Sequence, residues 1–159
     1  MSGASARRVA SRAVGKRLQQ FFHSPEIRAL APPATRSGGS PWMLGGCLIA
    51  AEAIQNIYGG KLIGLDADGG EKPGDDVVHV VVTHGGGYLD ALGFHRSLDD
   101  IQTILDNKYH LDQPVYPVPG RYALKSGIKQ DRGLSDTLAD LFTTPKTARM
   151  TKQIGKVLR

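Results

Sequence analysis

The chain of 159 residues contains a single cysteine, Cys47, and only 6% of its residues are aromatic. One cysteine excludes an internal disulfide framework and a zinc site built from several cysteines, so the composition gives no sign of an oxidising compartment. No apolar run approaches the roughly 18 residues that a membrane-spanning helix needs. The sequence therefore predicts a soluble protein with a modest core, in a non-oxidising compartment or a virion.

Acidic residues are scarce at both ends of the chain. Basic residues outnumber them by seven to one in residues 1–40 and by ten to five in residues 101–159, whereas residues 41–100 carry three basic and nine acidic residues. Basic ends on an acidic body suit a polyanion or the acidic surface of a neighbouring subunit, although solvated tails explain the pattern equally well. The candidate polyanion- or partner-binding residues are Arg7, Arg8, Arg12, Lys16, Arg17, Lys146, Arg149, Lys152 and Lys156.

The first 25 residues are rich in Ser, Ala and Arg and contain no acidic residue. This composition is typical of a mitochondrial transit peptide. An amphipathic helix is the alternative, because its apolar residues can gather on one side of it, namely Val9, Val14, Leu18, Phe21 and Phe22. We expect a basic N-terminal arm over residues 1–30 and a Pro/Gly/Ser linker over residues 31–41.

Cys47 follows a Gly-Gly pair and stands before a stretch, Leu48 to Tyr58, whose apolar spacing predicts a buried helix. Gly59 and Gly60 supply the stop signal. At a helix N-terminus, free backbone N–H groups and aligned peptide dipoles favour a thiolate, which makes Cys47 a candidate nucleophile. The alternative is a small buried hydrophobe, which is a common role for a free cysteine.

Two short apolar runs on either side of His84-Gly-Gly-Gly87 predict a β-hairpin. A turn centred near residues 84 and 85 brings His79 and Asp90 to roughly opposite positions on adjacent strands. Directly opposed side chains on one face have Cβ atoms about 4.5 to 5.5 Å apart, so the carboxylate could hold the imidazole. If Cys47 converges on this pair, the three residues form a nucleophile, a base and an orienting carboxylate.

Zinc binding by the histidines of this region is a weaker hypothesis. Imidazoles and a carboxylate are suitable zinc ligands, and His79, His84, Asp90 and His95 offer such a set. However, His84 falls at the turn and His95 beyond the strand, so the four side chains would meet at one point only if the chain took an unusual course. We expect no metal and no cofactor.

The rest of the chain reads as short elements followed by a basic end. Ser97-x-x-Asp100 predicts the start of a helix to about Tyr109. Pro114, Pro117 and Pro119 indicate an extended edge segment. A short helix is expected from Ser135 to Phe142, and Thr144-Pro145 predicts the start of a last helix. We therefore divide the chain into an α+β domain over residues 42–133 and a basic C-terminal helical arm over residues 134–159.

The order of three motifs resembles the papain-like cysteine hydrolase superfamily, including its transglutaminase-like and NlpC/P60-like branches, over residues 42–95. The motifs are Gly-Gly-Cys47-Leu-Ile-Ala-Ala-Glu-Ala, Val-Val-His79-Val-Val-Val and Gly-Tyr-Leu-Asp90-Ala-Leu-Gly. The resemblance implies an α+β fold in which a central helix packs on a small antiparallel sheet. It also implies a thiol protease or amidase, a cysteine hydrolase or acyltransferase that acts on an amide or isopeptide bond of a peptide or amide substrate.

One departure from this family concerns the oxyanion hole. Papain has a glutamine six residues before its cysteine, whereas Pro41 stands there in this chain. Any oxyanion hole would rest on backbone N–H groups near Gly46 and on the Trp42 indole. The alternative hypothesis is a non-catalytic component of a large assembly, a virion or a ribonucleoprotein particle, whose basic arms bind protein subunits or nucleic acid.

Overall fold

A computed structural model of the chain describes residues 3–32, 39–43, 45–67, 72, 74–144, 154, 156 and 157. Five strands form one antiparallel sheet in the order β4-β3-β2-β1-β5, so the chain has a mixed α+β fold as expected. The elements are α1 (Gly3–Phe22), α2 (Pro25–Arg28), α3 (Cys47–Tyr58), β1 (Leu62–Asp66), β2 (Val77–His84), β3 (Gly87–Asp90), β4 (Gly93–His95), α4 (Leu98–Tyr109), β5 (Tyr116–Pro119), the 3₁₀ helix η1 (Gly120–Leu124) and α5 (Arg132–Thr143).

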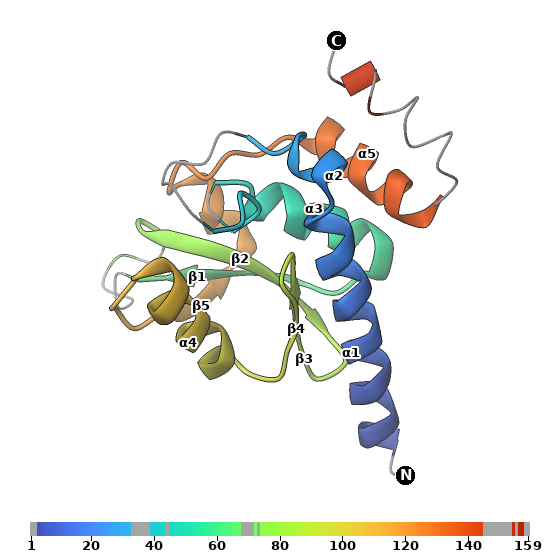
Figure 1. Cartoon of the computed structure of the whole chain (residues 1–159). Coiled ribbons are helices and arrows are strands. Elements are labelled where there is room, and N and C mark those ends of the chain that lie inside the picture. Colours follow the sequence, from blue (N-terminus) through green and yellow to red (C-terminus); the bar gives the residue numbers. More distant parts are fainter. Residues whose placement is uncertain are drawn as a thin grey trace.

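Two hydrophobic clusters cover the two faces of the sheet, with α3 on one side and α4 on the other (Figure 1). Val80 and Val82 of β2 belong to the larger cluster with α3, whereas Val81 packs with Ile101 and Leu105 of α4. Because side chains alternate along a strand, β2 is buried on both faces. This double burial explains why β2 lacks the alternation of polar and apolar residues.

Helix α3 is the central helix of the fold, and it is buried on nearly every side because both the sheet and α5 pack on it. Its apolar composition all round is typical of such a helix. It ends where Gly59 takes a positive φ of 73°, which glycine adopts without a steric penalty. Cys47 is its first residue, so the predicted helix is confirmed one residue earlier than expected.

The turn between β2 and β3 lies one residue later than the sequence indicated. Gly85 and Gly86 form a two-residue turn with φ of 55° and 80°, as such turns require. The register that follows places Asp90 beside Val81 and not directly opposite His79. His79 and Asp90 are thus offset by two residues across the strands and only roughly opposite, because the Gly-Gly pair, which supplies two positive φ angles, sets the turn.

Helix α1 packs along the edge of the sheet at β3 and β4 instead of standing apart as an arm (Figure 1). Leu18 and Phe22 are buried in the larger cluster, where Phe22 meets the Trp42 ring edge to face at 5.4 Å. Gly15 lies so close to the backbone of Phe94 that any Cβ would overlap it. The residues expected to form a separate N-terminal arm therefore share the core of the domain.

Helix α5 also belongs to this core, although the sequence suggested that an outer arm begins at residue 134. The helix starts earlier than expected, at Arg132, because Asp131 Oδ1 accepts a hydrogen bond from the Leu134 N–H at 2.9 Å and caps it. Leu138 and Leu141 are buried against α3. Of the predicted C-terminal cations, Lys156 is exposed, whereas Lys146, Arg149 and Lys152 lie outside the described residues.

Two local predictions are confirmed. Ser97 Oγ accepts a hydrogen bond from the Asp100 N–H at 3.3 Å and caps α4. Strand β5 lies at the edge of the sheet, where proline is tolerated since one side of the strand needs no N–H donors.

None of the helices in the described part of the chain is long and apolar enough to cross a membrane.

Candidate active site

The structure brings His79 and Asp90 together in the interior. Nε2 of His79 lies 2.9 Å from Oδ2 of Asp90, and the two residues are 0% and 2% exposed. Although Asp90 is offset along β3 from the position opposite His79, residues diagonal across two strands remain within reach of long side chains. The carboxylate can therefore orient the imidazole, as the sequence predicted, through a diagonal contact.

Each member of this pair stabilises the charged form of the other. Burial disfavours the imidazolium of His79, but hydrogen bonds and negative charge from Asp90 and Cys47 outweigh burial and raise the pKa of His79 to about 9. Burial likewise opposes ionisation of Asp90, yet hydrogen bonds from His79 and His95 and their charges hold the pKa of that carboxyl well below its usual range. The site thus holds an imidazolium and a carboxylate at neutral pH.

Cys47 is the third residue at this point. It is 2% exposed, stands at the N-terminus of α3, and acts on the His79 side chain through hydrogen bonding and charge. Nε2 of His79 is taken by Asp90, whereas Nδ1 is buried and makes no hydrogen bond of regular geometry with any described residue. Nδ1 is therefore the nitrogen available to the thiol.

His95 is a fourth member of the site that the sequence analysis had considered only as a zinc ligand. Its Nε2 donates to Oδ1 of Asp90 at 2.8 Å, and the Leu92 N–H donates to the same oxygen at 2.8 Å. The short strand β4 places His95 beside Asp90, because a second tight turn pairs Asp90 with Gly93. The Asp90-Ala-Leu-Gly93 spacing is the signal that could have revealed this turn.

His84, the remaining histidine of the zinc hypothesis, lies elsewhere. Its Nδ1 shares a hydrogen bond of 3.0 Å with Ser11 Oγ of α1, and its ring packs on the edge of Tyr58. Across the residues that the structure describes, no group of three or more His, Cys, Asp or Glu side chains is arranged to hold a metal ion. His84 instead ties the β2–β3 turn to α1.

Of the two oxyanion candidates, Trp42 has the free donor. Its ring is fully buried, and its Nε1–H has no hydrogen-bond partner among the described residues. The ring packs on Gly46, where an added Cβ would come within 3.0 Å of Cε3 of the indole. The Gly46 N–H already donates to the Pro41 carbonyl at 3.1 Å, so it would have to leave that partner to bind an oxyanion.

The site is closed in this structure. Trp42 and Met43, just before α3, are 0% and 1% exposed and lie in the larger and the smaller cluster respectively. The Ser40 N–H donates to the Tyr109 hydroxyl at 3.3 Å, which connects this segment to the end of α4. Burial, together with the negative charge of Asp90, raises the pKa of Tyr109. Cys47 itself is only 2% exposed.

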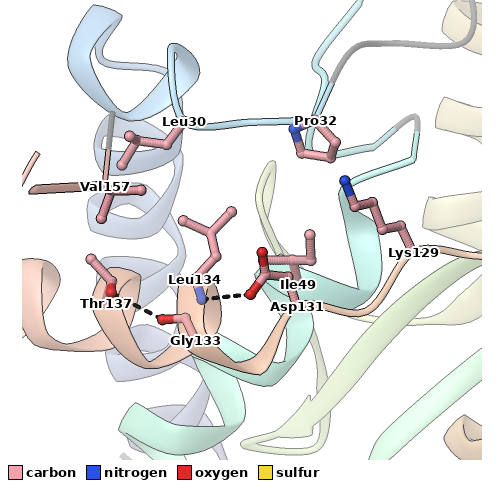
Figure 2. Close-up of a pocket in the computed structure, with 9 residues that line it drawn as sticks. All are labelled: Leu30, Pro32, Ile49, Lys129, Asp131, Gly133, Leu134, Thr137 and Val157. Atoms are coloured by element: carbon pink, nitrogen blue, oxygen red, sulfur yellow. Dashed lines mark hydrogen bonds between the residues drawn. The ribbon is translucent and has the colours of Figure 1, made fainter. Parts of the chain in front are cut away.

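A cavity of about 270 Å³ near the start of α3 and α5 is separate from this site (Figure 2). Leu30, Ile49 and Leu134 line it with Lys129 and further residues. Ile49 stands two positions after Cys47, and such positions point about 200° apart around a helix. Since Cys47 faces His79, the cavity lies on the other side of α3 and does not hold the reacting bond.

The predicted basic residues of α1 are separate from the buried site. Arg7, Arg8, Arg12 and Lys16 are exposed, and none of the four forms an ion pair with a described residue. Arg17 lies over the Phe142 ring at 5.0 Å from its centroid. These cations therefore lie on the surface of the domain, apart from the buried Cys47.

Comparisons with known proteins do not assign the site. No protein-family model, no curated protein and no solved structure matches the chain.

Proposed function

We propose that this chain is a cysteine hydrolase or acyltransferase, which attacks an amide or isopeptide bond with Cys47, His79 and Asp90. The orientation of His79 carries the proposal. Buried polar atoms in proteins usually have hydrogen-bond partners, yet Nδ1 of His79 has none of regular geometry among the described residues, while Nε2 is held by a carboxylate. A histidine that only stabilises a core normally uses both ring nitrogens in regular hydrogen bonds, whereas Nδ1 here lies beside a thiol.

The charge state of His79 supports the same function. A pKa of about 9 keeps the imidazole protonated at neutral pH. An imidazolium favours the thiolate form of a neighbouring sulfur, and the thiolate is the nucleophile in cysteine chemistry. Papain-like hydrolases use the same combination of cysteine, histidine and an orienting side chain, and their cysteine also heads a central helix.

The reaction follows from these positions. Sγ of Cys47 attacks the carbonyl carbon of the substrate, and the C–S bond forms as the carbonyl oxygen becomes an oxyanion. The proton on Nδ1 of His79 then moves to the leaving nitrogen, and the C–N bond breaks to release the amine. In the second half, Nδ1 takes a proton from water, the new C–O bond forms, and the C–S bond breaks. An amine in place of water gives transamidation.

Trp42 is the side chain best placed to stabilise the oxyanion. Its indole N–H is a buried donor without a partner among the described residues, and its ring packs against Gly46, which precedes Cys47. A preorganised donor of this kind is worth about 10² to 10³ in rate when it points at the developing charge. This role would compensate for the glutamine that papain has and this chain lacks.

The experiment that tests the function is the pH dependence of Cys47 alkylation by iodoacetamide, followed by mass spectrometry. The wild type is compared with His79→Ala and with His23→Ala, whose ring bonds the Gln19 carbonyl on α1. We expect the wild type and His23→Ala to be alkylated at neutral pH, and His79→Ala to lose this reactivity.

A second probe tests acyl transfer itself. p-Nitrophenyl acetate should acetylate Cys47 with release of nitrophenolate, and Cys47→Ala should show no release above the background. A thiol that stays inert in the folded protein, or that titrates alike in the wild type and His79→Ala, would overturn the proposal.

A further inference from the structure

Helix α1 has two faces with different roles. Its inner face packs on the sheet through Gly15, Leu18 and Phe22, all buried. Its outer face carries Arg8, Arg12 and Lys16, which are exposed and which we call the outer stripe. The helix has no acidic residue, and no described carboxylate pairs with the outer stripe. These positive charges are therefore not neutralised within the described structure.

The spacing of the outer stripe is regular. Its residues stand four positions apart, so they lie on one side of the helix and about 6 Å apart along its axis. Phosphate charges recur roughly every 3.4 Å along each strand of a nucleic-acid duplex. The positive charges of the stripe therefore recur on the same length scale, a few ångströms, as the phosphates of a nucleic-acid strand.

A cavity lies at the N-terminal end of the stripe. It has a volume of about 410 Å³ and is lined by Arg7, Arg8, Gly85 and Gly86. No hydrogen bond in the described part of the structure uses the N–H of either glycine. Free backbone N–H groups in a turn with left-handed residues can bind anions, and two guanidinium groups strengthen such a site. The hydrogen bond between Ser11 and His84 fixes this turn against α1.

We propose that the outer stripe and the Gly85–Gly86 turn bind the phosphodiester backbone of a nucleic acid, with one phosphate in the cavity and the strand along α1. This site is separate from the proposed catalytic site. The lining of the cavity contains no aromatic side chain for base stacking, so the contact reads the backbone and not the base sequence.

The fold disfavours a membrane as the partner. A helix that lies on a bilayer inserts its apolar face between the lipids, but the apolar face of α1 is already buried against β3 and β4. Val9 is the single large hydrophobic residue of α1 that is clearly exposed, at 57%. Polyanion binding through α1 therefore does not need lipid.

Binding of a short fluorescent single-stranded oligonucleotide, measured by anisotropy over a range of salt concentrations, tests the outer stripe. The variant Arg8→Gln/Arg12→Gln/Lys16→Gln is compared with Lys72→Gln/Lys108→Gln/Lys125→Gln, which removes the same charge from exposed positions outside α1. We expect the stripe variant to bind at least about tenfold more weakly. The slope of log K against log salt concentration should be shallower by about 2 for this variant, because each of the three lost phosphate contacts contributes about 0.7.

The cavity is tested by one isosteric pair of substitutions. Gly86 has open space around it and φ of 80°, which Asn and Asp tolerate better than other side chains. We expect Gly86→Asn to bind like the wild type, and Gly86→Asp to bind several-fold more weakly because its charge repels the phosphate. Thermal melting of both variants confirms that they fold equally well.

Three results would overturn the proposal. The first is an equal loss of oligonucleotide affinity in the stripe variant and the control variant. The second is an equal affinity of Gly86→Asn and Gly86→Asp. The third is wild-type binding to phosphatidylserine vesicles or polyglutamate that is as tight as binding to the oligonucleotide. Cys47 alkylation in the stripe variant should match the wild type, so failure here and failure of the catalytic proposal are distinguishable.

Discussion

Nε2 of His95 lies 2.8 Å from Oδ1 of Asp90, so the carboxylate that orients His79 is itself held by a second histidine. The other oxygen of Asp90 accepts from His79, and the Leu92 N–H completes the set. A carboxylate with three such donors in an apolar interior has one orientation. His95 therefore positions the proposed triad without touching the reacting atoms.

We expect His95→Ala to lower the free energy of unfolding by about 1 to 3 kcal/mol, because a buried carboxylate loses a donor. The rate of Cys47 alkylation at neutral pH should fall about tenfold, because a misoriented His79 raises the activation free energy by about 1.4 kcal/mol. His95→Gln keeps an N–H donor of similar reach and should recover both properties in part. If His95→Ala keeps the wild-type pH profile of alkylation, His95 serves stability alone.

The charge on Asp90 should set the pKa of His79. We expect Asp90→Asn to lower that pKa from about 9, because the imidazolium loses its anionic partner while its burial remains. An NMR titration of the imidazole nitrogens measures the shift. Asp75→Asn, a substitution at an exposed carboxylate, is the matched control and should leave the titration unchanged. An unaltered pKa in Asp90→Asn would contradict the ion pair.

Stability should depend on pH through the same two residues. The pKa of His79 is higher in the folded state than its ordinary 6.5, so its contribution is complete below pH 6.5 and is lost as the pH rises through about 9. The pKa of Asp90 is lowered, so its contribution is present at neutral pH and is lost in acid, below the ordinary carboxyl value.

Urea unfolding at a series of pH values measures this dependence. The free energy of unfolding should fall between pH 6.5 and 9 by at most about 1.4 kcal/mol per pH unit for a single proton. His79→Gln should lack this alkaline decrease. A wild-type curve that stays level up to pH 9 would show that His79 is neutral in the folded protein.

Trp42→Phe should separate oxyanion binding from thiol reactivity. Alkylation by iodoacetamide develops no oxyanion, so its rate should stay close to that of the wild type. Acetylation by p-nitrophenyl acetate passes through a tetrahedral intermediate, and its rate should fall by about 10². Equal effects on the two reactions would mean that Trp42 acts on the thiol or the fold and donates nothing to the oxyanion.

Gly15→Ala should destabilise the protein although alanine favours a helix by about 1 kcal/mol over glycine. The added Cβ would overlap the backbone nitrogen of Phe94, which no side-chain rotation relieves. Gly3→Ala, on the same helix with open space around it, should be neutral or slightly stabilising. Urea unfolding of both variants tests whether α1 is part of the cooperative domain. A stabilised Gly15→Ala would show that α1 is not packed on β4.

Much of the local structure was predictable because short-range signals control it. The Gly-Gly stop of α3, the Ser97 cap of α4 and the prolines of β5 act through the backbone within a few residues. The hairpin turn was placed one residue too early, since the three glycines left its centre open and only the pairing of both strands selects Gly85 and Gly86. The early start of α5 depends on Asp131, whose side chain caps the helix so that it begins three residues before the start that the sequence predicts.

For the candidate site, sequence alone proposed Cys47, His79 and Asp90, because a cysteine before a helix and two polar residues in apolar strands are unusual in a core. Their meeting was a matter of tertiary structure, since residues far apart in the chain meet only when α3 docks on the sheet. His95 reaches the site through a second turn. Helix α1 packs into the core because this buries the apolar side chains of Leu18 and Phe22 away from water. Sequence by itself determined the elements and their reactive groups, and packing decided which groups touch.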